Sequence, residues 1–193
     1  MAHAAAATAA RVPERGLDVY TQKVGIWVFL ASEVMFFSGL IGSYIVLRFG
    51  ASDTWAQPGE VLNVPVTAVN TFVLICSSVT MVKAFAAAEA GNQRQIKLFL
   101  FLTFLLGSLF LGVQGYEYTE LAHHGFTPQS GLYGATFFTM TGFHGFHVLC
   151  GVVCLGWATI QALKGRWGAS RYRGIEVLGL YWHFVDLVWI ILF

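Results

Sequence analysis

Five long apolar stretches constrain this chain more than any other feature of its sequence. A helix needs about 20 predominantly apolar residues to cross the hydrocarbon core of a bilayer. Inside a bilayer, only helices and closed barrels satisfy their own backbone hydrogen bonds. The sequence therefore predicts an all-α, polytopic membrane protein with five transmembrane helices in one bundle. The predicted helices cover approximately residues 24–48, 65–88, 96–121, 132–163 and 174–193.

The composition agrees with a membrane protein. Only 11% of the 193 residues are charged, whereas a soluble domain carries about 25%. The predicted organisation is a polar N-terminal tail, residues 1–22, followed by a five-helix domain, residues 23–193. The tail has no apolar core with a cleavage site, so we expect the first apolar stretch to remain as a membrane span. A formal net charge of +1 gives no support for a nucleic-acid partner.

The basic residues predict how the helices cross the membrane. Ten of the eleven Lys and Arg residues fall in the N-terminal tail, in the second and fourth connections, or in their flanks, and only Arg48 falls on the other side. Loops on the cytoplasmic side of membrane proteins carry an excess of Lys and Arg. We therefore expect the N-terminus inside and the C-terminus outside. The basic cluster of the fourth connection could also hold a lipid phosphate, and it consists of Lys164, Arg166, Arg171 and Arg173.

Glu33 is a lone carboxyl in the first apolar stretch. It lies about 10 residues into the predicted helix, and at about 1.5 Å per residue this places it roughly 15 Å from the membrane surface. Its neighbours on the same helix are apolar, so none of them can pair with it. Two explanations remain open. Either another helix supplies a partner, or desolvation keeps the carboxyl protonated.

The fourth and fifth helices carry the other ionisable side chains at membrane depth. His144 and His147 are three residues apart, and Glu176, His183 and Asp186 form one stripe at spacings of seven and three. The two helices are joined by a short connection, so we expect their polar faces to meet in the interior. Ionisable residues inside a span are candidates for function by default. A proton relay is one such hypothesis.

A buried hydrogen-bonded network that fixes helix packing is the interpretation we favour for these five side chains. The spacing is poor for a zinc site, which needs three or four converging ligands. Haem would need facing histidines with room for the macrocycle, and phenylalanines crowd this region. We therefore expect no catalytic residue, no metal and no cofactor bound by this chain.

Five sequence blocks resemble subunit III of haem-copper terminal oxidases, especially cytochrome c oxidase. The resemblance covers about residues 23–193. The resemblance is specific because the last two of the blocks, 131–148 and 179–189, occur together and in this order. The blocks are WVFLASEVMFF (27–37), VPVTAVNTFVLICSS (64–78), GYEYTE (115–120), GLYGATFFTMTGFHGFHV (131–148) and GLYWHFVDLVW (179–189).

The resemblance implies a non-redox subunit of a proton-pumping respiratory oxidase, which reduces O2 to water with electrons from cytochrome c. Haem and copper are expected in the partner subunit I, the main contact, with subunit II and other subunits also present. The family's subunit III supports proton uptake and protects the active centre, and structural phospholipids fill its cleft. Glu33 matches the family's buried, carbodiimide-reactive carboxyl. The implied location is the bacterial cytoplasmic (inner) membrane.

The chain departs from the longer family members, which have two further helices at the N-terminus. A short five-helix form also occurs in quinol oxidases, and accessory proteins of nitric oxide reductase share the fold, so both remain alternatives.

Two other classes of function also remain open. One is an independent ion transporter that uses Glu33 and the His/Asp face, and ion transport by the isolated chain would identify it. The other is a haem-binding electron carrier, which a Soret absorption band of the isolated chain would identify.

Overall fold

The computed structural model describes residues 20–50, 55, 63–168 and 172–193. Within them the chain is all-helical, and all five helices are long and apolar enough to cross a membrane. The predicted fold class is therefore confirmed. The predicted tail lies largely in residues 1–19, outside the described residues. The helices are α1 (Thr21–Gly50), α2 (Val64–Glu89), α3 (Gln93–His123), α4 (Leu132–Leu163) and α5 (Arg173–Leu192).

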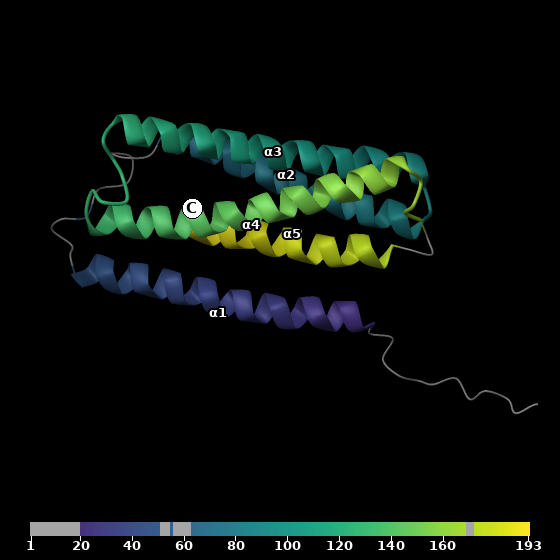
Figure 1. Ribbon diagram of the computed structural model, residues 1–193, viewed down its shortest axis with the longest axis horizontal. Helices are drawn as coiled ribbons and strands as arrows, with labels where there is room; N and C mark the ends of the chain where they lie inside the picture. The colour runs from purple at the N-terminus through teal and green to yellow at the C-terminus, as the bar shows by residue number, and fades with distance from the viewer. Residues whose placement is uncertain (1–19, 51–54, 56–62, 169–171) are drawn as a thin grey trace, which may run out of the picture.

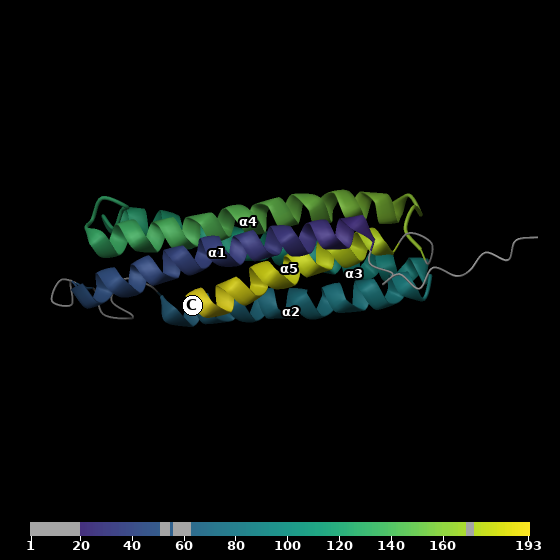
Figure 2. The same ribbon diagram turned by 90° about the horizontal axis from the view of Figure 1, so that it is seen from below.

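Successive helices run in opposite directions, so the bundle has two distinct ends (Figures 1 and 2). The start of α1, the α2–α3 turn and the α4–α5 connection lie at one end, on the right in Figure 1. We call it the basic end, because seven of the eight described Lys and Arg residues lie at or near it. Only Arg48, in the last turn of α1, lies at the opposite end. The seven are Lys23, Lys83, Arg94, Lys97, Lys164, Arg166 and Arg173.

A glycine turn pairs α2 with α3. Gly91 follows α2 with a left-handed φ of 71°, which glycine adopts without steric penalty. The next residue, Asn92, donates its backbone N–H back to Ala87 at 2.9 Å, the hydrogen bond of a common glycine-terminated helix end. The Asn92 side chain then caps α3 by accepting from the Gln95 backbone N–H at 3.3 Å. The turn is short, so α2 and α3 pack against each other as an antiparallel pair.

A single tryptophan of α5 joins three other helices. Trp182 is fully buried, and its indole lies directly against two glycines. A Cβ atom on Gly107 of α3 would come within 2.6 Å of the indole, and one on Gly151 of α4 within 2.7 Å. The indole Nε1–H donates to Ser77 Oγ of α2 at 2.9 Å. Small residues at helix contacts allow this close approach, which drives helix association in membranes.

A second tryptophan repeats the contact two turns along α5. Trp189 Nε1–H donates to Thr71 Oγ1 of α2 at 2.9 Å. Nearby, Asn70 of α2 donates its side-chain amide to the Phe110 carbonyl of α3 at 3.2 Å. Such interhelical hydrogen bonds contribute about 0.6 kcal/mol on average and up to about 1.7 kcal/mol. Short polar side chains and indoles therefore hold α2–α5 together as one core.

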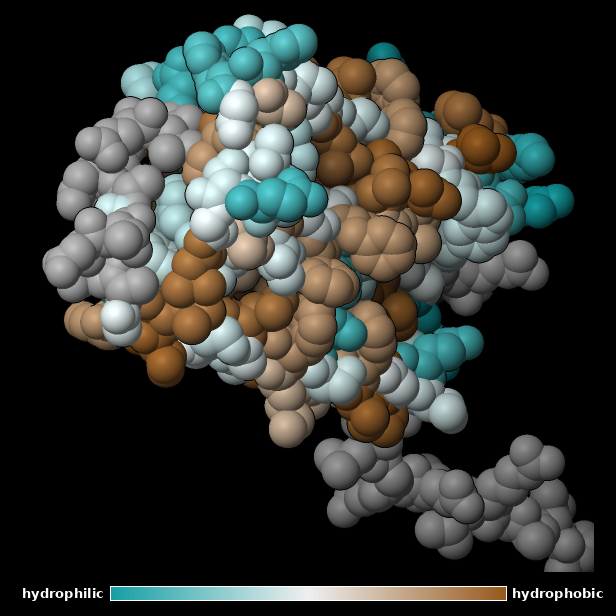
Figure 3. Space-filling model, turned by 60° about the vertical axis from the view of Figure 1, so that its left-hand side comes forward, coloured by the Kyte–Doolittle hydropathy of each residue, from teal (hydrophilic) through white to brown (hydrophobic). Residues whose placement is uncertain are grey.

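Helix α1 lies at the edge of this core, beside α4 and α5 (Figures 1 and 2). Only 6% of its most apolar segment is buried, against 28–39% in the other helices, so the rest of the chain leaves nearly all of α1 uncovered. Its buried residues are Leu30 and Phe37. Figure 3 shows broad apolar areas on the surface, with most hydrophilic residues gathered at the margins of the view.

We expect Gly107→Ala to destabilise the bundle by about 1–3 kcal/mol, because the added methyl group overpacks the buried indole. Gly112→Ala on the same helix is the matched control, since a Cβ there meets nothing within 4 Å. Reversible unfolding of the chain in mixed detergent micelles measures both. Equal stability of the two variants would show that the indole is not tightly held.

Candidate functional site

Glu33 and His147 form a polar link between α1 and α4. Glu33 Oε2 lies 3.1 Å from His147 Nε2, and the two side chains are 17% and 13% exposed. The sequence left open whether another helix would supply a partner for Glu33, and α4 does so. Since α1 buries little apolar surface, this link is one of the few specific contacts that hold it.

Hydrogen bonding fixes one ring proton of His147. Its Nδ1 lies 2.7 Å from the Phe143 carbonyl oxygen, which can only accept, so Nδ1 carries a hydrogen. Nε2 is left to face the Glu33 carboxyl at 3.1 Å. The Phe143 carbonyl thus fixes the orientation of the ring, and with it the position of the nitrogen that meets α1.

Aromatic rings surround the Glu33–His147 link. The ring of Phe37 lies 5.3 Å from the His147 ring, and Phe36 of α1 meets Phe143 of α4 at 5.0 Å. Edge-to-face contacts of this kind prefer centroid separations of about 4.5–7 Å. The rings reduce access of water to the polar link without closing it off.

His144 belongs to a different environment, although it is only three residues from His147. It is fully buried, stacks on Trp189 with the ring centroids 4.7 Å apart, and meets Phe110 edge-on at 6.1 Å. Neither ring nitrogen has a hydrogen-bond partner among the described residues. His144 therefore packs as an aromatic side chain of the core and does not join a hydrogen-bonded network there.

Glu176 forms a second link to α1, at the basic end. Its carboxylate accepts from Lys23 Nζ at 2.5 Å and from the Tyr20 hydroxyl at 2.8 Å. Arg173 lies over the Tyr20 ring, 4.8 Å from its centroid. Burial, followed by the neighbouring Glu176 carboxylate, raises the pKa of Tyr20 to about 12. The hydroxyl therefore keeps its proton and remains a donor at neutral pH.

His183 and Asp186 face α2. Ser78 Oγ lies 2.6 Å from His183 Nδ1. Asp186 is buried, and its Oδ1 has no partner among the described residues. This cluster joins α5 to α2.

From the sequence we expected the polar faces of α4 and α5 to meet in one interior network. In the structure they do not. Geometry explains the difference. At 3.6 residues per turn, His144 and His147 point about 60° apart, so they reach different neighbouring helices. Glu176 and Asp186 are ten residues apart, or about 15 Å along the helix axis.

The described members of the basic cluster after α4 lie at the basic end. Arg166 donates to the side chain of Gln161 at 3.2 Å, while Lys164 is exposed at the end of α4. Arg173 begins α5. Arg171 lies outside the described residues.

Sequence reasoning missed Ser78 and Tyr20, which complete two of these links. Both are neutral, and a hydroxyl in an apolar run gives little signal of its partner. Among the residues that the structure places, no three His, Cys, Asp or Glu side chains converge as metal ligands would. The ionisable groups instead join helices in pairs.

We expect a double-mutant cycle of Glu33→Leu and His147→Leu to give a coupling energy of about 0.5–1.7 kcal/mol, because the two groups pair across helices at membrane depth. Unfolding in mixed micelles provides the measurement. The control is Glu120 and His124, a pair at 3.2 Å at the C-terminal end of α3 in which both side chains are more than half exposed. Its coupling should stay below about 0.5 kcal/mol, and equal couplings would contradict the special role of the α1–α4 link.

Comparison with known proteins identifies the family. The family model described as cytochrome c oxidase subunit III matches residues 14–193. A cytochrome c oxidase subunit 3 from Corynebacterium diphtheriae is 42% identical over 88% of this chain and 84% of its own length. A probable subunit 3 from Nocardia farcinica is 38% identical over the same shares.

A probable quinol oxidase subunit 3 from Staphylococcus haemolyticus is also similar, with 31% identity over 94% of this chain and 90% of its own. The resemblance seen in the sequence blocks is therefore confirmed over almost the whole chain. The chain belongs to the cytochrome c oxidase subunit III family.

Proposed function

We propose that this chain is a non-catalytic subunit that stabilises the catalytic subunit of a proton-pumping terminal oxidase and supports proton uptake into it. The observation that carries the proposal is the use of the ionisable side chains within the spans. Glu33 binds His147, Glu176 binds Lys23, and His183 binds Ser78. Side chains that are paired across helices in this way stabilise helix packing, and this role fits a non-catalytic subunit better than a catalytic one. Haem and copper then belong to subunit I, with subunit II also in the complex.

We further propose that the exposed face of α1 meets partner subunits or phospholipid, because so little of this helix is buried within the chain. The one-sided distribution of Lys and Arg supports an N-terminus on the cytoplasmic side of a bacterial inner membrane. Lys164, Arg166, Arg171 and Arg173 would then lie where lipid phosphates gather.

Cytochrome c is the electron donor that we propose for the complex. The relatives named cytochrome c oxidase subunit 3 reach 42% identity, against 31% for the relative named a quinol oxidase subunit. A quinol oxidase remains the second candidate. Co-purification of the chain with its complex, together with the haem spectrum and donor oxidation by that complex, tests the assignment.

Glu33→Gln should abolish carbodiimide labelling of this chain while leaving initial oxygen reduction largely intact. Glu33 is a partly exposed carboxyl in apolar surroundings, where a hydrophobic carbodiimide can reach it. Labelling is measured by mass spectrometry of the purified complex. Asp186→Asn is the control and should retain the label. Full labelling of the Glu33→Gln chain would show that the reactive carboxyl belongs to another residue.

Removing the subunit should shorten the catalytic lifetime of the oxidase without removing its initial activity, because the chain supports the active centre and does not contain it. Oxygen consumption followed over prolonged turnover, with and without the subunit, measures this. Lifetimes that match within error would refute the protective role. Loss of all activity from the first turnover would show that the chain takes part in the reaction.

A further inference from the structure

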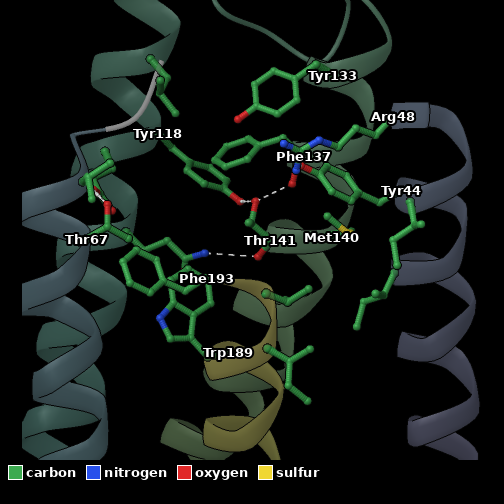
Figure 4. A pocket seen from close by; sticks show the side chains of 18 of the residues that line it. Tyr44, Arg48, Thr67, Tyr118, Tyr133, Phe137, Met140, Thr141, Trp189 and Phe193 are labelled. Atoms are coloured by element: carbon green, nitrogen blue, oxygen red, sulfur yellow. Dashed lines mark hydrogen bonds between the residues drawn. The ribbon is translucent and has the colours of Figure 1, made fainter. Parts of the chain in front are cut away.

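A cavity at one end of the bundle and a surface at mid-depth both carry polar side-chain atoms that have no hydrogen-bond partner among the described residues. The cavity has a volume of about 520 Å³ and lies at the end opposite the basic end, where Figure 4 shows Arg48 and Tyr133 beside it. The unpartnered atoms in its lining include Trp55 Nε1 and Gln114 Oε1. A polar cavity of this size has room for water, which also surrounds the ends of a transmembrane bundle. Water can therefore satisfy these atoms, and they do not require a protein partner.

His183 lies near the middle of the membrane instead. It comes ten residues after Arg173, where α5 begins at the basic end, and this corresponds to about 15 Å along the helix axis. Half of a hydrocarbon core of about 30 Å is the same distance. Acyl chains cannot form hydrogen bonds, and the core of a bilayer holds no water that could replace them. A polar atom at the surface of the chain at this depth therefore requires a partner from protein.

One ring nitrogen of His183 is not satisfied within the chain. Nδ1 lies 2.6 Å from Ser78 Oγ of α2. Nε2 makes no hydrogen bond with another of the described residues and is not buried, so it reaches the surface. One turn later, Asp186 is 7% exposed, and its buried Oδ1 also lacks a partner in the described part of the chain. Helix α5 thus presents an imidazole nitrogen, close to a buried carboxyl group, to whatever covers this face.

Apolar side chains flank Nε2 on the outside of the bundle, where Figure 2 shows α2 and α5 side by side. Residues three, four or seven apart share one face of a helix, and exposed apolar residues occur at these spacings from His183 on α5 and from Ser78 on α2. Histidine and other polar side chains form hydrogen bonds across contacts between transmembrane helices. We call this area the α2–α5 surface, and its members are Ile75, Val82, His183, Leu187 and Ile190.

We propose that a transmembrane helix of another oxidase subunit packs on the α2–α5 surface and hydrogen-bonds to His183 Nε2 through a hydroxyl or amide side chain. The side chains of Ser, Thr, Asn and Gln can each donate or accept, so they suit either tautomer of the imidazole. A charged partner side chain would place a further charge at mid-membrane, which is costly. Acyl chains alone would leave Nε2 without a hydrogen bond.

This inference rests on the proposed function, because it needs a complex with other subunits, but its claim is narrower. The proposed function leaves the exposed face of α1 to partner subunits or phospholipid, whereas His183 assigns a protein partner to α2 and α5. The two fail in different ways. If the chain does not co-purify with the oxidase, the proposed function is wrong. If the chain co-purifies but no other subunit lies at the α2–α5 surface, the function stands and the inference is wrong.

Photocrosslinking in the assembled complex tests the occupant of this surface. A photoreactive phenylalanine analogue replaces Leu187, which is 56% exposed and lies one turn from His183, so the imidazole stays unchanged. We expect a crosslink to a membrane-spanning segment of another subunit, with a hydroxyl or amide side chain within about one turn of the crosslinked residue. Mass spectrometry identifies the segment. Any other result, whether lipid alone, a second copy of this chain or no crosslink, would overturn the proposal.

Two substitutions of His183 separate its outer contact from its inner one. The amide group of Asn replaces the Nδ1 side of an imidazole, while the longer Gln reaches to the Nε2 side. His183→Asn should therefore lose the partner helix and His183→Gln should keep it. We expect the His183→Asn complex to release this subunit about three- to twentyfold faster on dilution into detergent, as loss of one interhelical hydrogen bond implies. Release from the His183→Gln complex should change less than about twofold.

His124→Asn is the matched control, because it makes the same substitution at a histidine that is 75% exposed at the end of the bundle. It should leave the release rate unchanged. Equal acceleration by His183→Asn and His183→Gln would show that His183 acts only within the chain, and this would overturn the proposal. Unaltered release from the His183→Asn complex would overturn it as well. If a variant fails to assemble, the crosslinking experiment decides alone, since it retains His183.

Discussion

The close approach of Trp182 to two glycines is the contact on which the rest of the bundle depends. In a bilayer, lipid chains are as apolar as leucine side chains, so helices gain little by hiding apolar surface from their surroundings. Association must come from packing and from hydrogen bonds. Trp182 supplies both, because its indole fills the space left by Gly107 and Gly151 and its N–H reaches Ser77. Through this one side chain, α5 fixes its position relative to α2, α3 and α4.

Polar side chains then attach helix α1 to the core formed by α2–α5. Helix α1 has only two buried residues, and specific polar contacts tie it near mid-membrane and at the basic end. The Glu33–His147 link lies among aromatic rings, and Glu176 is shared by Lys23 and Tyr20. A helix held by a few directional bonds keeps its rotation about its own axis, while most of its surface stays free for lipid or other subunits.

Periodicity and composition were enough to predict the fold class, because a span of apolar residues has few alternatives in a bilayer. The ionisable residues were also found from the sequence, since a charge in an apolar run stands out. The side chains that they contact could not be predicted from the sequence. Neighbours such as His144 and His147 differ by about 60° around the helix, and only the arrangement of α1, α3 and α5 decides that one packs on Trp189 while the other meets Glu33. The sequence also contained no sign of a cavity beside Arg48, because its lining comes from all five helices and from Trp55.

The peripheral position of α1 has a consequence for the order in which the bundle comes apart. The contacts of Trp182 and Trp189 lie among α2–α5, whereas α1 lies against α4 and α5 and has two buried residues. Separation of α1 leaves the α2–α5 contacts in place, so it costs less free energy than removal of another helix would. We therefore expect α1 to detach first when the bundle is weakened.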